Sequence, residues 1–170
     1  MKNIVLISAM MLISMASFGR KHVSETAVVV ADTIYYAADQ TSVSHADQAA
    51  YYRLLLTQNN GNKKEDVFTD YYMDGTLKAE GGYDFIDLGN DKNSIFNGSV
   101  TTYYVNGKEK LNGKYLNGKR EGYFTLHMRN GSVAVIAYKD GKSRFDYFMV
   151  TNPDGTQEKR SLSEIKSLLQ

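Results

Sequence analysis

The chain contains no cysteine and no tryptophan, and it has only one proline in 170 residues. Without cysteine, a disulfide framework and a zinc site built on thiolates are both excluded. Basic residues number 20 and acidic residues 19, so the net charge of +1 gives no overall field that would attract nucleic acid. With 42% hydrophobic and 23% charged residues, the composition is close to the globular average and indicates one soluble domain.

No apolar run in the chain is long enough to span a membrane. The N-terminus instead has the order of a secretory signal peptide: Lys2, an apolar run over residues 4–13, then small residues. The run is ten residues long. Because a spanning helix needs about 20 apolar residues, cleavage is favoured over an uncleaved anchor, and cleavage after Ala16 or after Gly19 fits equally well.

We therefore predict a signal peptide over residues 1–19 and an exported protein, periplasmic or secreted. A lipoprotein would need a cysteine at the new N-terminus, and the chain has none. About 150 residues remain after cleavage, which is enough to bury a core without disulfides.

Glycines mark the turns of the predicted fold. Nine of the 14 glycines directly follow Asn or Asp. Such dipeptides favour hairpin turns, because both central residues of a type I′ turn need positive φ. The nine pairs are Asn60-Gly61, Asp74-Gly75, Asn97-Gly98, Asn106-Gly107, Asn112-Gly113, Asn117-Gly118, Asn130-Gly131, Asp140-Gly141 and Asp154-Gly155. They predict a meander of antiparallel strands.

Two segments between these turns have clear strand patterns. Residues 122–128 place Phe124 and Leu126 on one face and Tyr123 and Thr125 on the other. Residues 133–138 are apolar at nearly every position, which predicts a strand buried on both faces.

The spacing of the turns indicates a repeat. Glycines 75, 107, 131 and 155 are separated by 32, 24 and 24 residues, and glycines 98, 118 and 141 by 20 and 23. The long first interval matches a polar insertion near residues 87–94. Two interleaved series with a period near 23 predict a two-stranded unit that stacks on its neighbours into one elongated sheet.

The repeat resembles a known family. Residues 71–81 (YYMDGTLKAEG), 103–110 (YYVNGKEK) and 113–124 (GKYLNGKREGYF) are similar to successive MORN-type repeats, in the bacterial variant labelled YwqK-family antitoxin. The resemblance covers about residues 67–158, and its last unit departs from the pattern because Arg144-Phe145-Asp146 replaces the expected glycine. It implies stacked β-hairpins and an antitoxin-like capture of a protein partner, which for an exported chain must be extracytoplasmic.

The segment before the repeats, residues 20–66, is predicted to cap the repeat sheet. Residues 33–38 are prone to form a strand, and residues 44–50 fit one or two helical turns. Residues 51–56 predict a strand that pairs with residues 67–72 through a turn at residues 59–62.

The segment after the repeats, residues 159–170, is predicted to form a short helix. Ser161 and Glu164 form a capping-box pattern, and Leu162, Ile165 and Leu169 fall on one helical face. This helix would cover the last hairpin or an open sheet edge. The fold predicted from the sequence is therefore mainly β: an elongated antiparallel meander of MORN-like hairpins with a small N-terminal cap and a short C-terminal helix.

No catalytic or metal-binding motif stands out. Residues 113–120 nearly match a phosphate-binding loop, but Arg120 stands where Ser or Thr is needed, and hairpin turns replace the required helix. The three histidines, His22, His45 and His127, are not at metal-ligand spacing. We predict no catalytic residues, no metal and no cofactor.

An oxygen-rich segment, with Asp84, Asp87, Asn90, Asp91 and Asn93, lacks the ligand order of a calcium-binding loop. A solvated insertion between strands is the favoured interpretation. An alternative function is that of an envelope hydrolase acting on glycan or peptide. The carboxylates of this segment, together with Glu80, are the residues that would carry out that reaction.

A basic cluster lies in the middle of the repeats, with aromatic residues between its members. It consists of Lys108, Lys110, Lys114, Lys119 and Arg120. The cluster makes contact with anionic lipid headgroups a second alternative function. The nearly balanced charge of the whole chain argues against strong electrostatic capture of anionic lipid or nucleic acid. Export also argues against nucleic acid as a partner.

Tyrosine is the remaining candidate for recognition. All 13 tyrosines lie between residues 35 and 147, and four doublets each place one ring on either face of a strand. Rings aligned across strands stabilise a sheet, and they also offer an amphipathic surface to a protein or glycan. The candidate partner-binding residues are Tyr72, Tyr103, Tyr115 and Tyr123. The function predicted is that of an exported, non-enzymatic protein that presents a tyrosine-rich sheet face to an extracytoplasmic protein.

Overall fold

The computed structural model describes residues 33–60, 63–165 and 169. The predicted signal peptide and the Asn60-Gly61 turn fall wholly or partly outside the described residues. The strands are β1 (Ile34–Tyr36), β2 (Ser42–Val43), β3 (Tyr51–Asn60), β4 (Lys63–Tyr72), β5 (Leu77–Phe85), β6 (Ile95–Tyr103), β7 (Glu109–Leu116), β8 (Lys119–His127), β9 (Val133–Lys139), β10 (Lys142–Ser143), β11 (Tyr147–Thr151) and β12 (Gln157–Ser161).

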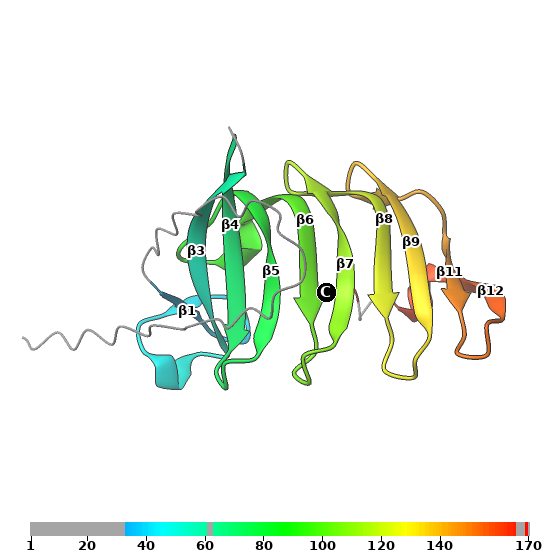
Figure 1. The fold of residues 1–170 in the computed structure, drawn as a ribbon, viewed down its shortest axis with the longest axis horizontal. Helices are drawn as coiled ribbons and strands as arrows, with labels where there is room; N and C mark the ends of the chain where they lie inside the picture. The colour runs from blue at the N-terminus through cyan, green and yellow to red at the C-terminus, as the bar shows by residue number, and fades with distance from the viewer. Residues whose placement is uncertain (1–32, 61–62, 166–168, 170) are drawn as a thin grey trace, which may run out of the picture.

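These strands form one antiparallel sheet in which chain neighbours are almost always sheet neighbours. The order is β12-β11-β9-β8-β7-β6-β5-β4-β3-β1-β2, and β10 pairs with β9. The sheet is long and open, with β1 and β2 at one end and β12 at the other (Figure 1). The predicted mainly β, elongated meander is confirmed.

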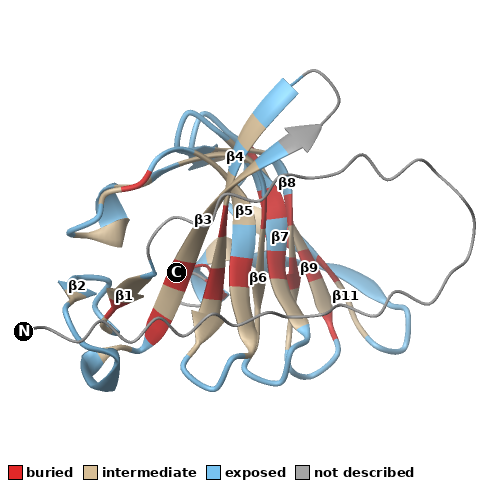
Figure 2. Cartoon of the chain, turned by 60° about the vertical axis from the view of Figure 1, so that its left-hand side comes forward, coloured by how far each residue is buried: buried red, intermediate tan, exposed pale blue. Residues whose placement is uncertain are grey.

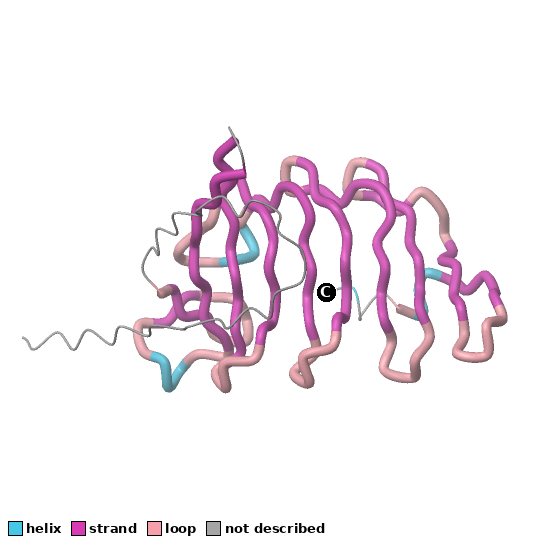
Figure 3. The backbone as a smooth tube through the Cα atoms, in the orientation of Figure 1, coloured by secondary structure: helices cyan, strands magenta, loops and turns pink. Residues whose placement is uncertain are grey.

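The N-terminal part extends the repeat sheet. Strand β3 pairs with β4 over its whole length, from Tyr51 opposite Tyr72 to Asn60 opposite Lys63, as predicted. Strand β1 pairs with both β2 and β3. The predicted helical segment is a single 3-10 turn, η1 (Ala46–Gln48). Figure 3 shows how little of the described chain is helical.

Four turns that join successive strands, at the same end of the strands, have the same hydrogen bonds. In each, an Asp or Asn side chain, at residue 74, 106, 130 or 154, accepts from the backbone N–H two residues on. Each glycine that follows has positive φ, between 77° and 87°. Hydrogen bonds from Thr76 lower the pKa of Asp74, and those from Thr156 lower that of Asp154. The first predicted glycine series is therefore a true structural repeat.

The second glycine series is only partly a series of turns. Asn117-Gly118 and Asp140-Gly141 are two-residue turns with both residues at positive φ. Gly98 instead lies inside β6, opposite Tyr115, and its prediction as a turn is wrong. The chain reverses between β5 and β6 through the longer loop at residues 86–94.

Gly113 was also predicted to form a turn, and it lies inside β7 instead. A Cβ atom at this position would stand 2.4 Å from ring atoms of Phe124, which lies on the neighbouring strand β8. Glycine therefore makes room for an aromatic ring on the sheet surface.

The two faces of the sheet differ in burial. We call the face that carries the buried side chains Phe68, Ala79, Val100, Leu111 and Phe124 the inner face, and the opposite face the outer face. Along β8, Phe124 and Leu126 are buried and Tyr123 is 72% exposed, as the alternation predicts. Figure 2 shows the buried segments as red bands that recur from strand to strand.

Strand β9 corrects one prediction. Its even-numbered residues, Ala134, Ile136 and Tyr138, are buried on the inner face, whereas the odd-numbered ones are only half-buried. The sheet is a single layer here, so an apolar sequence on both faces does not mean burial on both faces.

Aromatic rings form a continuous row on the inner face. Phe68, Phe96, Tyr115, Phe124 and Tyr138 follow one another with ring centroids 4.9–5.8 Å apart. Such separations are typical of favourable aromatic pairs. The row joins the smaller core cluster around β4–β6 to the larger one around β7–β11.

In the described part of residues 159–170, the predicted C-terminal helix is not seen. Residues 157–161 are strand β12, followed by one 3-10 turn, η3 (Leu162–Glu164). The predicted capping box is present at Ser161 and Glu164. Ile165 and Leu169 are buried in the larger core on the inner face, which also includes Phe148 and Val150 of the last hairpin. Among the described residues, no helix has the length and hydrophobicity to cross a membrane.

Candidate functional site

A groove of about 570 Å³ lies on the inner face between two coverings. One covering is the loop at residues 86–94, which contributes Asp91, Lys92 and Ser94, and the other is Leu169. Small and apolar side chains form the floor: Ala79, Val100, Thr102 and Leu111. The basic side chains around it are Arg53, Lys78, Lys92, Lys110 and Arg120, against the acidic Asp70 and Asp91, a formal charge of +3.

Two of these lysines occupy equivalent places in successive repeats. Lys78 and Lys110 each stand three residues after a turn glycine. Pairing skips from Ala79 to Leu77 on β5, and from Leu111 to Glu109 on β7, so each lysine is the extra residue of a β-bulge. Bulges redirect side chains and recur beside functional sites.

Lys78 lies over an aromatic ring and forms a long ion pair with a buried carboxylate. Its Nζ lies 3.7 Å from the centroid of the Tyr51 ring and 3.8 Å from Oδ2 of Asp70. The side chain is 31% exposed. Burial lowers the pKa of Lys78, an effect that Asp70 opposes and Lys110 reinforces. A cation over a tyrosine face in a recessed position is a typical feature of a binding site.

Lys110 and Arg120 add charge on the other side of the groove. Burial lowers the pKa of Lys110, and the neighbouring charge of Arg129 lowers it further. Arg120 donates to the Tyr115 and Tyr138 hydroxyls, at 3.3 and 3.1 Å, and to the carbonyl of Leu169. Among the described residues, neither basic group has a carboxylate partner within 4.0 Å.

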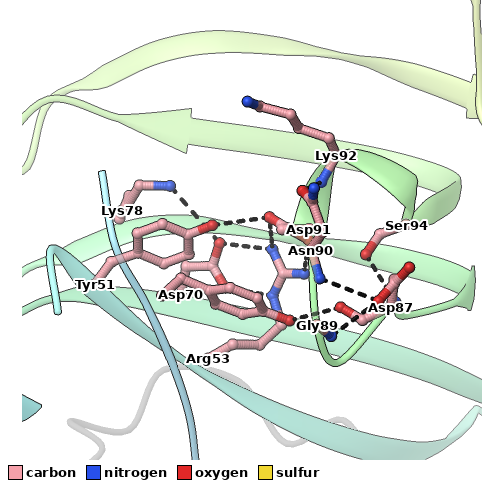
Figure 4. Close-up of polar contacts among 11 residues, drawn as sticks. Tyr51, Arg53, Asp70, Lys78, Asp87, Gly89, Asn90, Asp91, Lys92 and Ser94 are labelled. Atoms are coloured by element: carbon pink, nitrogen blue, oxygen red, sulfur yellow. Dashed lines mark hydrogen bonds and ion pairs between the residues drawn. The ribbon is translucent and has the colours of Figure 1, made fainter. Parts of the chain in front are cut away.

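Under the loop lies a buried ionic network centred on Arg53 (Figure 4). Arg53 donates to Asp70 through Nε at 2.6 Å and through Nη2 at 2.9 Å. It also donates to both carboxylate oxygens of Asp91, and the Tyr51 hydroxyl donates to Asp91 at 3.0 Å. Arg53 and Asp70 expose only 1% and 2% of their side chains.

Ionisation in this network follows from its hydrogen bonds. Burial lowers the pKa of Arg53, but the hydrogen bonds and charges of Asp70 and Asp91 outweigh it, so the pKa is raised. Burial raises the pKa of Asp70 while Arg53 opposes the rise. Because the guanidinium binds this carboxylate bidentately, the pair is ionised at neutral pH.

The oxygen-rich segment forms one wall of the groove, and hydrogen bonds hold it in place. The Asp87 carboxylate accepts from the backbone N–H groups of Gly89 and Asn90, at 2.8 and 3.0 Å. The backbone also bonds the loop to the N-terminal hairpin, from Ser42 N–H to the Gly89 carbonyl and from Asp91 N–H to the Gln40 carbonyl, both at 2.9 Å. The expectation of a solvated insertion is wrong for Asp91, which faces Arg53.

The carboxylates named for a hydrolase divide between two places: Glu80 and Asp84 both line a second hollow of about 920 Å³, and Asp91 lines the groove. Asp84 accepts from Asn97 at 2.8 Å, Glu80 accepts from Tyr103 at 2.6 Å, and Asp91 belongs to the Arg53 network. Within the described part of the chain, no group of three or more His, Cys, Asp or Glu residues is placed to hold a metal ion.

Three of the four candidate tyrosines line the groove. Tyr72 donates to the Tyr103 carbonyl at 3.1 Å, and Tyr115 stands in the inner aromatic row. Tyr103 lies at the rim, where its ring reaches the outer face and its hydroxyl meets Glu80; burial and this acceptor raise its pKa to about 12. Tyr123 is apart from the others on the outer face.

The basic cluster divides between the faces. Lys110 and Arg120 line the groove, whereas Lys108 is exposed in a turn. Lys114 is exposed on the outer face, and Lys119 is paired with Asp140 at 2.8 Å. Residues 113–120 form a β-hairpin, which is not the geometry of a phosphate-binding loop.

The outer face has a shorter tyrosine ladder. The rings of Tyr35, Tyr52 and Tyr71 follow one another with centroids 6.3 and 5.3 Å apart. This arrangement is the predicted alignment of outer rings, limited to β1, β3 and β4, and it includes none of the four candidate tyrosines.

Arg53, Asp70 and Lys78 were missed by the sequence reasoning. A signal was present, because Arg53 and Asp70 each fall at a position of their strand that alternation assigns to the buried face, beside Tyr51 and Phe68. A charged residue at a buried position needs a partner, and that rule would have selected this pair.

Comparisons of the chain with protein-family models, with curated proteins and with solved structures give no match. The resemblance to MORN-type repeats therefore stays a prediction from the sequence.

Proposed function

We propose that this chain is an exported, non-enzymatic repeat protein that binds another extracytoplasmic protein through the groove on its inner face. The proposal rests on one observation: candidate residues from two separate sets meet in one groove. Two candidate tyrosines, Tyr72 and Tyr115, and two candidate basic residues, Lys110 and Arg120, line the same groove, and Tyr103 stands at its rim.

The composition of the groove supports binding. Tyrosine and arginine are the residues that most often dominate protein interfaces, because they supply large contact areas together with hydrogen bonds. Both coverings are held in place, the loop by Arg53 and the C-terminal segment by Ile165 and Leu169 in the core. A groove that is formed before binding costs little conformational entropy to occupy.

Export is proposed on the N-terminal sequence. The pattern of residues 1–19 predicts removal in the mature protein. A partner would then be met outside the cytoplasm, and the antitoxin-like role that the resemblance implies would require an extracytoplasmic target.

A pair of variants tests which face binds. Thr102 is half-buried at the centre of the groove floor, and Thr102→Tyr places a ring where the partner would lie. Tyr123→Ser removes the most exposed ring of the outer face. In capture of proteins from an extracytoplasmic extract, we expect Thr102→Tyr to lose the partner and Tyr123→Ser to keep it. The reverse pattern would place binding on the outer face and contradict the proposal.

A further inference from the structure

The four repeat units differ at one equivalent position, and the two units that carry lysine there border the groove. The residue three places after each turn glycine is Lys78, Lys110, Ala134 and Glu158 in the four units. The first two are bulged, whereas Ala134 and Glu158 pair in register with Leu126 and Val150. The bulge and the lysine occur together, and only in the two units that border the groove.

The two unbulged units differ in their surroundings. Ala134 is buried in the larger core beside the C-terminal segment. A bulged lysine there would disrupt that packing. Glu158 lies in the exposed edge strand β12. Repetition alone therefore does not account for the lysines, and their placement is specific to the open part of the inner face.

The lysines are spaced for a chain-like ligand. They stand on β5 and β7, with β6 between, so their backbones are about 10 Å apart from the spacing of adjacent strands. In an extended peptide, alternate side chains on one face repeat at about 6.6–6.8 Å. Long lysine stems bridge the difference between these spacings, so two acidic side chains of one extended segment can each meet an ammonium group.

The remaining walls suit the rest of such a peptide. Phe96 and Tyr115 line the groove with half-buried rings, and the buried side chains of Val100 and Leu111 give an apolar floor. Both carboxylates, Asp70 and Asp91, are bound by Arg53, and Asp70 is shared with Lys78 at 3.8 Å. Among the described residues Lys110 has no carboxylate within 4.0 Å, so the groove keeps an excess of positive charge. The groove lies between the loop at residues 86–94 and Leu169, with a volume of about 570 Å³.

We propose that the partner segment is an acidic peptide bound in an extended conformation, with Lys78 and Lys110 each pairing with one of its carboxylates. The assignment rests on the proposed function, since it names what enters the same groove.

Defined peptides test the assignment without knowledge of the natural partner. The probes are an octapeptide that alternates Glu with Thr and its counterpart with Gln in place of Glu. We expect the Glu peptide to bind at least about 10-fold more tightly, and its affinity to fall with increasing salt, because each charge-assisted hydrogen bond contributes about that much. Equal affinity for the two peptides would overturn the proposal.

Matched double variants test the residues. Lys78→Gln with Lys110→Gln is expected to weaken the Glu peptide by about 10- to 100-fold and to leave the Gln peptide unchanged. The control, Lys114→Gln with Lys119→Gln, makes the same change in net charge at exposed positions and is expected to cost less than about 3-fold. An equal loss in both double variants would mean that only overall charge matters. The unfolding midpoint of each variant is measured beside its affinity, and single variants replace a double variant that does not fold.

Other anionic ligands are outcomes of the same experiment. An oligouronate, or vesicles of anionic phospholipid, that bind more tightly than the Glu peptide and depend on the same two lysines would overturn the peptide assignment. Failure here is distinguishable from failure of the proposed function. If Thr102→Tyr abolishes capture of the partner while Lys78→Gln with Lys110→Gln retains it, the groove binds a protein but not through acidic side chains.

Discussion

Replacing Arg53 by Met is expected to lower the free energy of unfolding by about 3–5 kcal/mol, because removal of one partner leaves buried charges uncompensated. Asp70, with 2% of its side chain exposed, would lose both of its hydrogen bonds from the guanidinium, and Asp91 would lose its anchor. Denaturant unfolding followed by circular dichroism measures the change.

Two controls accompany this variant. Arg160→Ala breaks an exposed pair with Glu164 and is expected to cost less than about 1 kcal/mol. Adding Asp70→Asn to Arg53→Met removes one of the stranded charges and is expected to recover part of the stability. A loss below about 1 kcal/mol for Arg53→Met would mean that the buried network does not form.

The second large effect is expected at Phe124, where Phe124→Ala should destabilise the protein by about 3–5 kcal/mol. The ring is 1% exposed, lies over Gly113, and stands between Tyr115 and Tyr138 at 5.4 and 5.1 Å. Removing it leaves a cavity in the larger core cluster and interrupts the aromatic row between Tyr115 and Tyr138.

The preceding residue gives a matched control. Tyr123 is 72% exposed on the opposite face of the same strand, so Tyr123→Ala is expected to change the free energy of unfolding by no more than about 0.5 kcal/mol. Similar losses for the two variants would contradict the assignment of inner and outer faces.

The sheet could be predicted from the sequence because its signals are local. An Asp or Asn side chain closes each turn two residues on, and the glycine after it takes positive φ, so the turns at Gly75, Gly107, Gly131 and Gly155 depend on adjacent residues alone. Alternation along β8 predicts its faces in the same way.

The errors arose where neighbours in space decide. Gly113 has the sequence of a turn but makes room for Phe124, a residue 11 places further along the chain. Residues 133–138 are apolar throughout, yet nothing among the described residues buries the outer side of β9. Periodicity describes the strand and says nothing about how many layers the protein has.

The groove was only partly predictable. Tyr72, Tyr115 and Lys110 were selected by residue type, but that they meet on one face depends on strand order and on the loop over residues 86–94. Lys78 was missed because a single lysine after a turn has no distinctive sequence signal. Its orientation comes from the bulge, which only the register of β4 and β5 reveals.

The absence of cysteine allows a direct test of the central claim, that a partner occupies the inner groove. Lys92 lines the groove and Lys114 lies on the outer face, and both are exposed. Lys92→Cys and Lys114→Cys each create a unique site for a cysteine-directed photo-crosslinker. We predict that the partner is crosslinked from position 92 and not from position 114. Crosslinking from position 114 alone would contradict the account.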